Sequence, residues 1–305
     1  MALEGLHHIT AITADAPRNV DFYARALGLR LVKKTVNFDQ PDVYHLYYGD
    51  ERGTPGSILT FFDFPGVARG THGAGMPYRV LWRVQDAEAL DFWSARLKTE
   101  GVDADRSGDG LRFTDPEGLE HELVAEDVPD PPLAAKADDI PPEHALLGFA
   151  GARAYAGTTR ASSAPLLEAL GFEETAADAW LLAGAERRAR WHYDEPPGRG
   201  RQGAGTIHHL AWSAAHDIEL EHFRDIVTRA GARPPPIIDR QYFHSVYFRD
   251  PSGVLFELAT RDIGFVVDEP AATLGSELKL PAQYESRREQ LERVLTPITN
   301  PRAAA

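Results

Sequence analysis

The 305-residue sequence predicts an α+β fold built from four copies of one β-α-β-β-β module. The first observation behind this prediction is a repeated motif, Asp-Pro-x-Gly followed after three residues by Glu-Leu, at 115–123 and 250–258. The motif combines a turn with an apolar strand that ends in a glutamate. The second observation is that a strand, an amphipathic helix and three short strand candidates recur in the same order. The four modules begin near residues 4, 77, 146 and 205.

Each module opens with an apolar strand and continues with a helix that closes on a glycine, the usual C-terminal stop of a helix. The predicted opening strands are "LHHITAIT" (6–13), "YRVLWRV" (78–84), "LLGFAGARAYA" (146–156) and "TIHHLAWSA" (206–214). The predicted helices cover 16–27, 86–100, 163–170 and 217–230, and their closing glycines are Gly28, Gly101, Gly171 and Gly231.

A segment rich in proline and acidic residues, 127–144, separates the second module from the third and reads as a linker. We therefore expect one domain at 1–126 and another at 145–267. A tail, 268–305, carries one more helix at 282–295, which we expect to pack on the surface.

The composition narrows the classes of function. A formal net charge of −14 argues against nucleic acid and against anionic membrane surfaces as partners. Without cysteine, a metal must be held by His, Asp or Glu. We expect a cytoplasmic protein, because the N-terminus lacks the pattern of a signal peptide and no run is long enough to span a membrane. The oligomeric state is left open, and a homo-oligomer is compatible with the sequence.

The modules differ in the side chains that could bind a metal. Modules one and four carry histidine pairs on their first strands, His7-His8 and His208-His209. The last strand of module four adds Glu257, whereas module one has Thr60 at that place. Pairing module one with module four therefore collects two histidines and one carboxylate. Pairing module two with module three collects only Glu122, so we expect a scaffold there.

Two histidines and one carboxylate on one face of a metal are typical of non-haem Fe(II) oxygenases, because adjacent coordination positions stay open. Consecutive strand residues point to opposite faces, so one member of each pair is expected to bind. The alternatives are His7 with His208, or His8 with His209. Most of the other histidines, His45 among them, lack the pattern and are expected to be structural or solvent-facing.

Long motifs resemble a known family. "LHHITAIT", "LVKKTVNFD…YHLYYGDERGTPGSILTFF", "IHHLAWS", "DRQYFHSVYFRDPSGVLFELAT" and the tail "LGSELKLPAQYESRREQLERVL" are similar to the ring-cleaving dioxygenases of the vicinal oxygen chelate superfamily, and within it to the branch that opens hydroquinones. The resemblance runs nearly end to end. It implies two pairs of half-barrels, a small aromatic substrate and O2 as partners, and Fe(II) as the cofactor, with Mn(II) or another divalent metal as a substitute occupant.

The resemblance also implies roles for individual residues. It makes the second histidine of each pair a ligand, so the implied metal site is His8, His209 and Glu257. The residues implied around the ligands and the substrate are His7, Thr10, His208, Arg240 and Tyr247. From the residues alone, Arg240 would be expected to pair with Asp239 or Asp250, and Tyr247 to be a core aromatic. Two other functions stay as alternatives: a metal isomerase or lyase of the glyoxalase type, and a metal-free binding or resistance protein.

Overall fold

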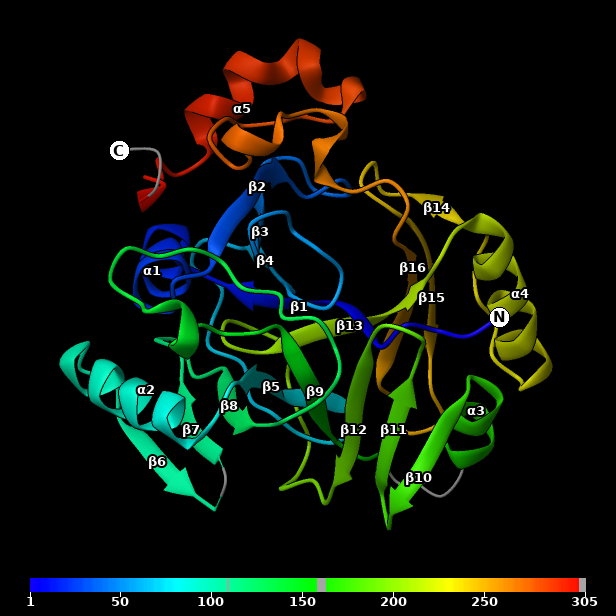
Figure 1. Cartoon of the computed structure of the whole chain (residues 1–305). Coiled ribbons are helices and arrows are strands. Elements are labelled where there is room, and N and C mark those ends of the chain that lie inside the picture. The colour runs from blue at the N-terminus through cyan, green and yellow to red at the C-terminus, as the bar shows by residue number, and fades with distance from the viewer. Residues whose placement is uncertain (109, 158–162, 302–305) are drawn as a thin grey trace.

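The computed structural model describes residues 1–108, 110–157 and 163–301, whose strands form two eight-stranded sheets (Figure 1). The first sheet takes its strands from modules one and four, in the order β14-β15-β16-β13-β1-β4-β3-β2. The second takes its strands from modules two and three, in the order β10-β11-β12-β9-β5-β8-β7-β6. The predicted α+β class and the predicted module pairing are confirmed. Both sheets draw on both sides of the linker, and the division into two sequence domains stays a prediction.

The strands of the first sheet are β1 (Leu6–Thr13), β2 (Arg30–Val36), β3 (Tyr44–Gly49), β4 (Ile58–Asp63), β13 (Ile207–Ala214), β14 (Ile238–Asp239), β15 (His244–Arg249) and β16 (Leu255–Thr260). Those of the second sheet are β5 (Met76–Val84), β6 (Ala104–Ser107), β7 (Gly110–Thr114), β8 (Glu120–Ala125), β9 (Phe149–Tyr155), β10 (Phe172–Ala176), β11 (Ala179–Ala183) and β12 (Arg188–Asp194).

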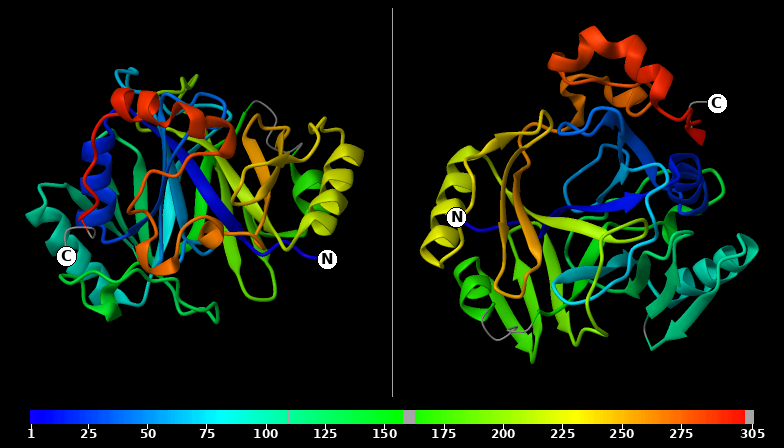
Figure 2. Two further views of the ribbon diagram at one scale, coloured as in Figure 1. Left: turned by 90° about the horizontal axis from the view of Figure 1, so that it is seen from above. Right: turned by 180° about the vertical axis from the view of Figure 1, so that it is seen from behind.

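The helices lie around the outside of the two sheets (Figures 1 and 2). They are α1 (Ala16–Val20), α2 (Ala87–Thr99), α3 (Ala164–Ala169), α4 (Asp217–Arg229) and α5 (Arg288–Val294), with 3-10 turns at Pro142–His144, Phe265–Val267, Ala271–Thr273 and Ala282–Arg287. Among the described residues, no helix has the length and apolar character needed to cross a membrane.

Helix α2 shows why these segments fold as predicted. The side chain of Asp86 caps its first turn by accepting a hydrogen bond from the backbone N–H of Ala89. The residues Leu90, Trp93 and Leu97 recur at helical spacing and are fully buried, so one face of the helix joins the core. After the helix, the chain turns away at a glycine with a φ of +72° at position 101.

Two predicted helices differ from the structure at their ends. The segment predicted at 16–27 is α1 followed by a π-helical turn, Asp21–Ala26, in which the N–H of Leu27 donates to the carbonyl of Phe22. The tail helix begins as a 3-10 turn after Pro281 and becomes α-helical only at Arg288. Sequence periodicity does not distinguish these helix types, because all of them present an apolar face at similar spacing.

Strand β1 lies in the middle of the first sheet, antiparallel to β13 and parallel to β4. Its pairing with β13 shifts register between Leu6 and His8 and again between Thr10 and Ala11. Such irregularities bend a strand and re-aim its side chains. This central strand joins the first module to the fourth, and it carries the first of the predicted ligands.

The tail is tied to the first sheet by a buried lysine. The ammonium of Lys33, on β2, lies 2.7 Å from the Asp268 carboxylate and 2.8 Å from that of Glu269. Asp268 also accepts hydrogen bonds from the side chains of Gln241 and Tyr242. The same contacts therefore join the tail to the loop that precedes β15.

Candidate metal centre and aromatic cavity

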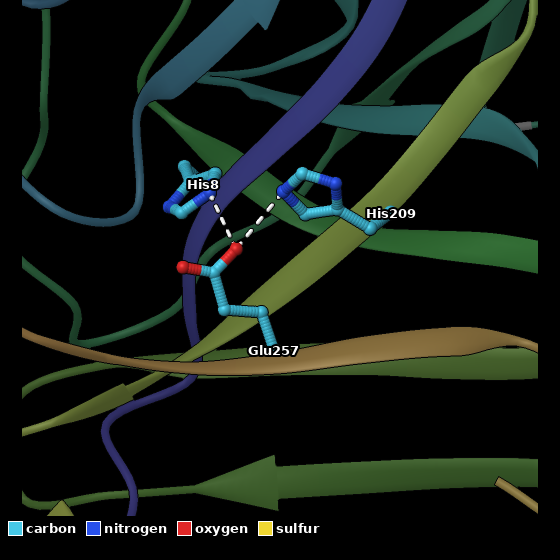
Figure 3. A group of neighbouring side chains, drawn as sticks. All are labelled: His8, His209 and Glu257. Carbon is cyan, nitrogen blue, oxygen red and sulfur yellow. Dashed lines mark ion pairs between the residues drawn. The ribbon is translucent and has the colours of Figure 1, made fainter. Parts of the chain in front are cut away.

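Three side chains that could hold a metal ion meet on one face of the first sheet (Figure 3). The strand register explains the meeting: His8 on β1 is paired with Ala211 on β13, which is paired with Glu257 on β16. The Oε2 atom of Glu257 lies 3.2 Å from Nε2 of His8 and 2.9 Å from Nε2 of His209. The ligand atoms of the three residues all lie within 4.8 Å of one another, and the three side chains are buried.

The contacts among these three residues fit a shared metal ion. Despite the short distances, Oε2 of Glu257 has no partner with hydrogen-bond geometry among the described residues. This lack of hydrogen-bond geometry is expected when the lone pairs of the three ligand atoms point to a shared metal position and not to one another. Its other carboxylate oxygen, Oε1, accepts a hydrogen bond of 2.5 Å from Ser245. The donor set of two imidazoles and one carboxylate suits a divalent transition metal.

The protonation states also suit metal binding. Burial alone would raise the pKa of Glu257, but positive charge at the places of His8 and His209 outweighs burial and holds that pKa well below its usual value, and a metal ion bound between neutral imidazoles would supply such charge. Burial lowers the pKa of His209, opposed by Glu257. An ionised carboxylate and neutral imidazoles are the forms that bind metals, because each then offers a lone pair.

The first histidine pair explains why two adjacent histidines stand on one strand. Nε2 of His7 lies 2.9 Å from the carbonyl oxygen of Thr260, which can only accept, so this nitrogen carries the proton. Burial lowers the pKa of His7 to about 3, so the ring is neutral and its Nδ1 has a lone pair. Nδ1 of His8, 2.9 Å away, therefore donates to His7. Nε2 of His8 is left unprotonated and faces Glu257, as a metal ligand requires.

The second pair repeats the arrangement. Nδ1 of His208 lies 2.7 Å from Nδ1 of His209, and burial lowers the pKa of His208 to about 4. When His209 donates through Nδ1, its Nε2 keeps the lone pair that faces Glu257. The two pairs differ in two respects: Nε2 of His7 donates to the carbonyl oxygen of Thr260, and His208 lines the neighbouring cavity whereas His7 is not among its lining residues.

The site opens into a cavity of about 260 Å³. Its aromatic lining consists of Phe38, Tyr47, Phe62, Phe64, Phe243 and Tyr247. Its polar lining consists of His8, Thr10, Asn37, Asp39, His45, His208, His209 and Arg240. A cavity whose wall combines aromatic rings with polar groups beside a possible metal site is typical of a site for a small aromatic molecule.

Arg240 and Tyr247 lie together at this cavity. The guanidinium carbon of Arg240 is 5.4 Å from the centre of the Tyr247 ring, and its Nη1 is 3.2 Å from a carboxylate oxygen of Asp39. Its partner is thus Asp39, in place of Asp239 or Asp250. Burial raises the pKa of Tyr247, and Glu257 raises it further, so the hydroxyl stays protonated.

The sequence interpretation missed other cavity residues. His45 was expected among the structural or solvent-facing histidines, but it lines the cavity and is half-buried against Tyr47, with ring centres 4.1 Å apart. The available signal was the spacing in "YHLYYG": residues two apart on a strand share a face, and β3 pairs with β4, which holds Thr60. The contact depends on strand neighbours, and only the sheet order shows them.

The second sheet holds no equivalent group. Glu122, which matches Glu257 in the repeated motif, pairs with the guanidinium groups of Arg79 at 2.9 Å and Arg112 at 3.2 Å. The carboxylate of Glu122 is neutralised by arginines, whereas the carboxylate of Glu257 faces histidines. Among the described residues, His8, His209 and Glu257 form the one group suited to a metal.

Fold and site together define a member of a metal-using superfamily. Residues 5–123 and 154–258 match the family described as the Glyoxalase/Bleomycin resistance protein/Dioxygenase superfamily, and the chain belongs to this family. Glyoxalase I from Zea mays has the same fold, with a TM-score of 0.61 at 15% identity over 85% of this chain and 92% of that one.

Relatives of similar length narrow the class. The chain is 38% identical over 303 residues to the protein named "Putative ring-cleaving dioxygenase MhqE" of Bacillus subtilis, covering 97% of this chain and 99% of that one. It is 32% identical to the chlorohydroquinone/hydroquinone 1,2-dioxygenase of Sphingobium indicum, with 96% of each chain covered. A crystal structure titled as a putative dioxygenase from Bacillus subtilis superimposes with a TM-score of 0.90 at 37% identity, covering 98% of both chains. The predicted resemblance to ring-cleaving dioxygenases, and with it the prediction of an oxidoreductase enzyme, is confirmed.

Proposed function

We propose that the protein is a non-haem Fe(II)-dependent dioxygenase that cleaves the ring of a hydroquinone-type diol and inserts both atoms of O2. The observation that carries the proposal is a group of three ligands, His8, His209 and Glu257, at the end of an aromatic-lined cavity. Fe(II) held there would supply adjacent open positions at which a phenolate and dioxygen can meet. Mn(II) or another divalent metal stays an alternative occupant. The dioxygenase names of the full-length relatives support the same class.

The cavity residues account for the orientation of a para-diol. A catechol can chelate a metal through two adjacent oxygens, but a hydroquinone offers only one, so the protein must fix the ring. The aromatic wall excludes water and holds the ring plane. Arg240 carries the positive charge that stabilises developing oxyanions, and Tyr247 keeps a hydroxyl proton to donate. His208 and Thr10 line the same space and complete the set of polar groups.

The residue at the position of a possible fourth protein ligand favours this proposal over a glyoxalase-type isomerase. Thr60 is paired with Thr10 on β1 as Glu257 is paired with Ala211 on β13, so Thr60 stands where a second carboxylate would bind. Its hydroxyl is 2.8 Å from His45 and 3.0 Å from Thr10. A site with three protein ligands suits a reaction that needs room for both substrate and O2.

Metal analysis and oxygen uptake test the proposal. Protein purified without oxygen and loaded with Fe(II) should consume O2 when hydroquinone is added, and consume it more slowly with catechol. The Glu257→Gln variant, matched in size, should fold but hold little iron. Full iron binding by that variant would reject the ligand set, and a preference for catechol would reject the para-diol class.

A further inference from the structure

Three residues on neighbouring strands of the first sheet, Tyr47, Thr60 and Thr10, form a row beside the proposed metal ligands. Tyr47 on β3 is paired with Thr60 on β4, and Thr60 is paired with Thr10 on β1. Thr10 in turn is paired with His209, a predicted metal ligand. His45, two residues before Tyr47, places its ring between Tyr47 and Thr60. The row therefore runs from the cavity wall to the metal group.

The side chains of this row are joined by hydrogen bonds. The Tyr47 hydroxyl is 2.9 Å from Nδ1 of His45, and Nε2 of His45 is 2.8 Å from the Thr60 hydroxyl. The Thr60 hydroxyl donates to the Thr10 hydroxyl oxygen at 3.0 Å. Tyr47, Thr60 and Thr10 are almost fully buried and His45 is half-buried, so most of these groups are shielded from bulk solvent.

The hydrogen bond that Thr60 donates to Thr10 gives this chain of hydrogen bonds one direction. Burial raises the pKa of Tyr47 well above its usual value, so its hydroxyl keeps a proton that it can donate, and because Thr60 gives its hydrogen to Thr10, Thr60 must accept from His45. Burial lowers the pKa of His45 well below its usual value, so the ring is neutral, with one N–H and one lone pair. Nδ1 then accepts from Tyr47, and Nε2–H donates to Thr60. The Thr60 hydroxyl donates its own hydrogen to the Thr10 hydroxyl oxygen.

We infer that Tyr47, His45 and Thr60 are positioning residues that fix the Thr10 hydroxyl as a hydrogen-bond donor into the cavity. Because the oxygen of Thr10 is occupied by the hydrogen from Thr60, its own hydrogen points to the cavity that Thr10 lines. The site thus presents a neutral donor, Thr10, next to Thr60, which stands where a fourth ligand would bind, and this donor suits an anionic oxygen of a phenolate-type ligand. The role of Thr10 toward substrate rests on the proposed function, but the direction of the chain does not.

The tautomer of His45 tests the direction without any turnover. Long-range ¹H–¹⁵N correlation spectra of the full chain, loaded with diamagnetic Zn(II), report which ring nitrogen carries hydrogen. The His45 signals are assigned by their loss in the His45→Gln variant. We expect the proton on Nε2 in the wild type, and a shift toward Nδ1 in Thr60→Val, which removes the acceptor for Nε2–H. A proton on Nδ1 in the wild type would overturn the inference.

Kinetics test whether the chain acts through Thr10. Thr60→Val should lower turnover of hydroquinone about tenfold, the loss expected from one misplaced hydrogen bond. Thr60→Ser, which keeps the hydroxyl, should restore turnover, and bound iron should be equal in both variants. Adding Thr60→Val to Thr10→Val should cause no further loss, because the effect passes through Thr10. Additive losses in the double variant would overturn the inference. A wild type that is inactive on hydroquinone would reject the proposed function, and the tautomer of His45 would then decide whether the hydrogen bonds run in the inferred direction.

Discussion

Replacing the buried Lys33 by methionine should destabilise the protein strongly. The lysine side chain is fully buried, and its ammonium contacts Asp268 and Glu269 in the tail. Methionine fills the volume of the aliphatic stem but removes the charge. The Glu269 carboxylate, which is 1% exposed, is then left without its cation. Asp268 also loses a contact that orders it against Gln241 and Tyr242, next to Arg240.

The size of the effect follows from the burial of Glu269. Removing one partner of a buried ion pair costs about 3–5 kcal/mol, because the remaining charge stays desolvated and uncompensated. For 305 residues, an unfolding entropy of about 2.1 cal/mol/K per residue converts this free energy into a fall in Tm of roughly 5–8 °C.

Differential scanning calorimetry at fixed metal loading measures this change. Lys279→Met is the matched control: Lys279 pairs with the exposed Glu277 in the same tail, and its loss should leave Tm unchanged. The double variant Lys33→Met/Glu269→Gln should regain part of the lost stability, because it also removes the stranded charge. A single variant as stable as the wild type, or a double variant as unstable as the single one, would refute the reasoning.

Three further predictions concern the site and its surroundings. Fe(II) at about 100 times its dissociation constant should stabilise the wild type by about 2.7 kcal/mol, or roughly 4 °C in Tm, and should leave the Tm of Glu257→Gln unchanged in thermal melts. Arg240→Gln and Tyr247→Phe should keep their iron in metal analysis but lose about 10²-fold in oxygen uptake with hydroquinone, and unchanged rates would make both residues structural. Burial raises the pKa of Asp63 to about 6, from about 3.9 in the unfolded chain. The folded state therefore binds more protons at Asp63 between these values, and the contribution of Asp63 to stability should fall by about 2 kcal/mol as pH rises from about 4 to 6. Asp63→Asn should flatten this dependence in urea titrations, and an unchanged slope would contradict the assignment.

The module architecture was predictable because its signals are local. The turn motif at Asp115 and Asp250, the closing glycines and the alternation of apolar residues are properties of short segments. Comparison of equivalent positions then suggested which modules pair, because only one pairing collects the histidines with Glu257. The same local reasoning could not choose between His7 and His8, since alternation predicts only that the two point apart, and the irregular pairing of β1 brings their rings into hydrogen-bond contact instead.

The rest of the site depends on neighbours that are distant in sequence. His45 lacks any histidine partner on its own strand, so nothing local marked it, and its role becomes visible only when β3 and β4 are seen side by side. Arg240 could not be matched to Asp39 for the same reason, because 201 positions separate them. The π-helical turn after α1 was invisible because its apolar face resembles that of an ordinary helix.

The central place of β1 has a consequence for biosynthesis. Among the strands of the first sheet β1 is made before the others; its neighbour β13 is made some two hundred residues later, and β16, which carries Glu257, some two hundred and fifty residues later. A nascent chain therefore holds one histidine pair for most of its synthesis without a complete ligand set. A metal ion can be retained only after the two ends of the chain have joined. With the proposed ligand set, metal capture is thus a late event in folding, and partly made chains hold no complete metal site.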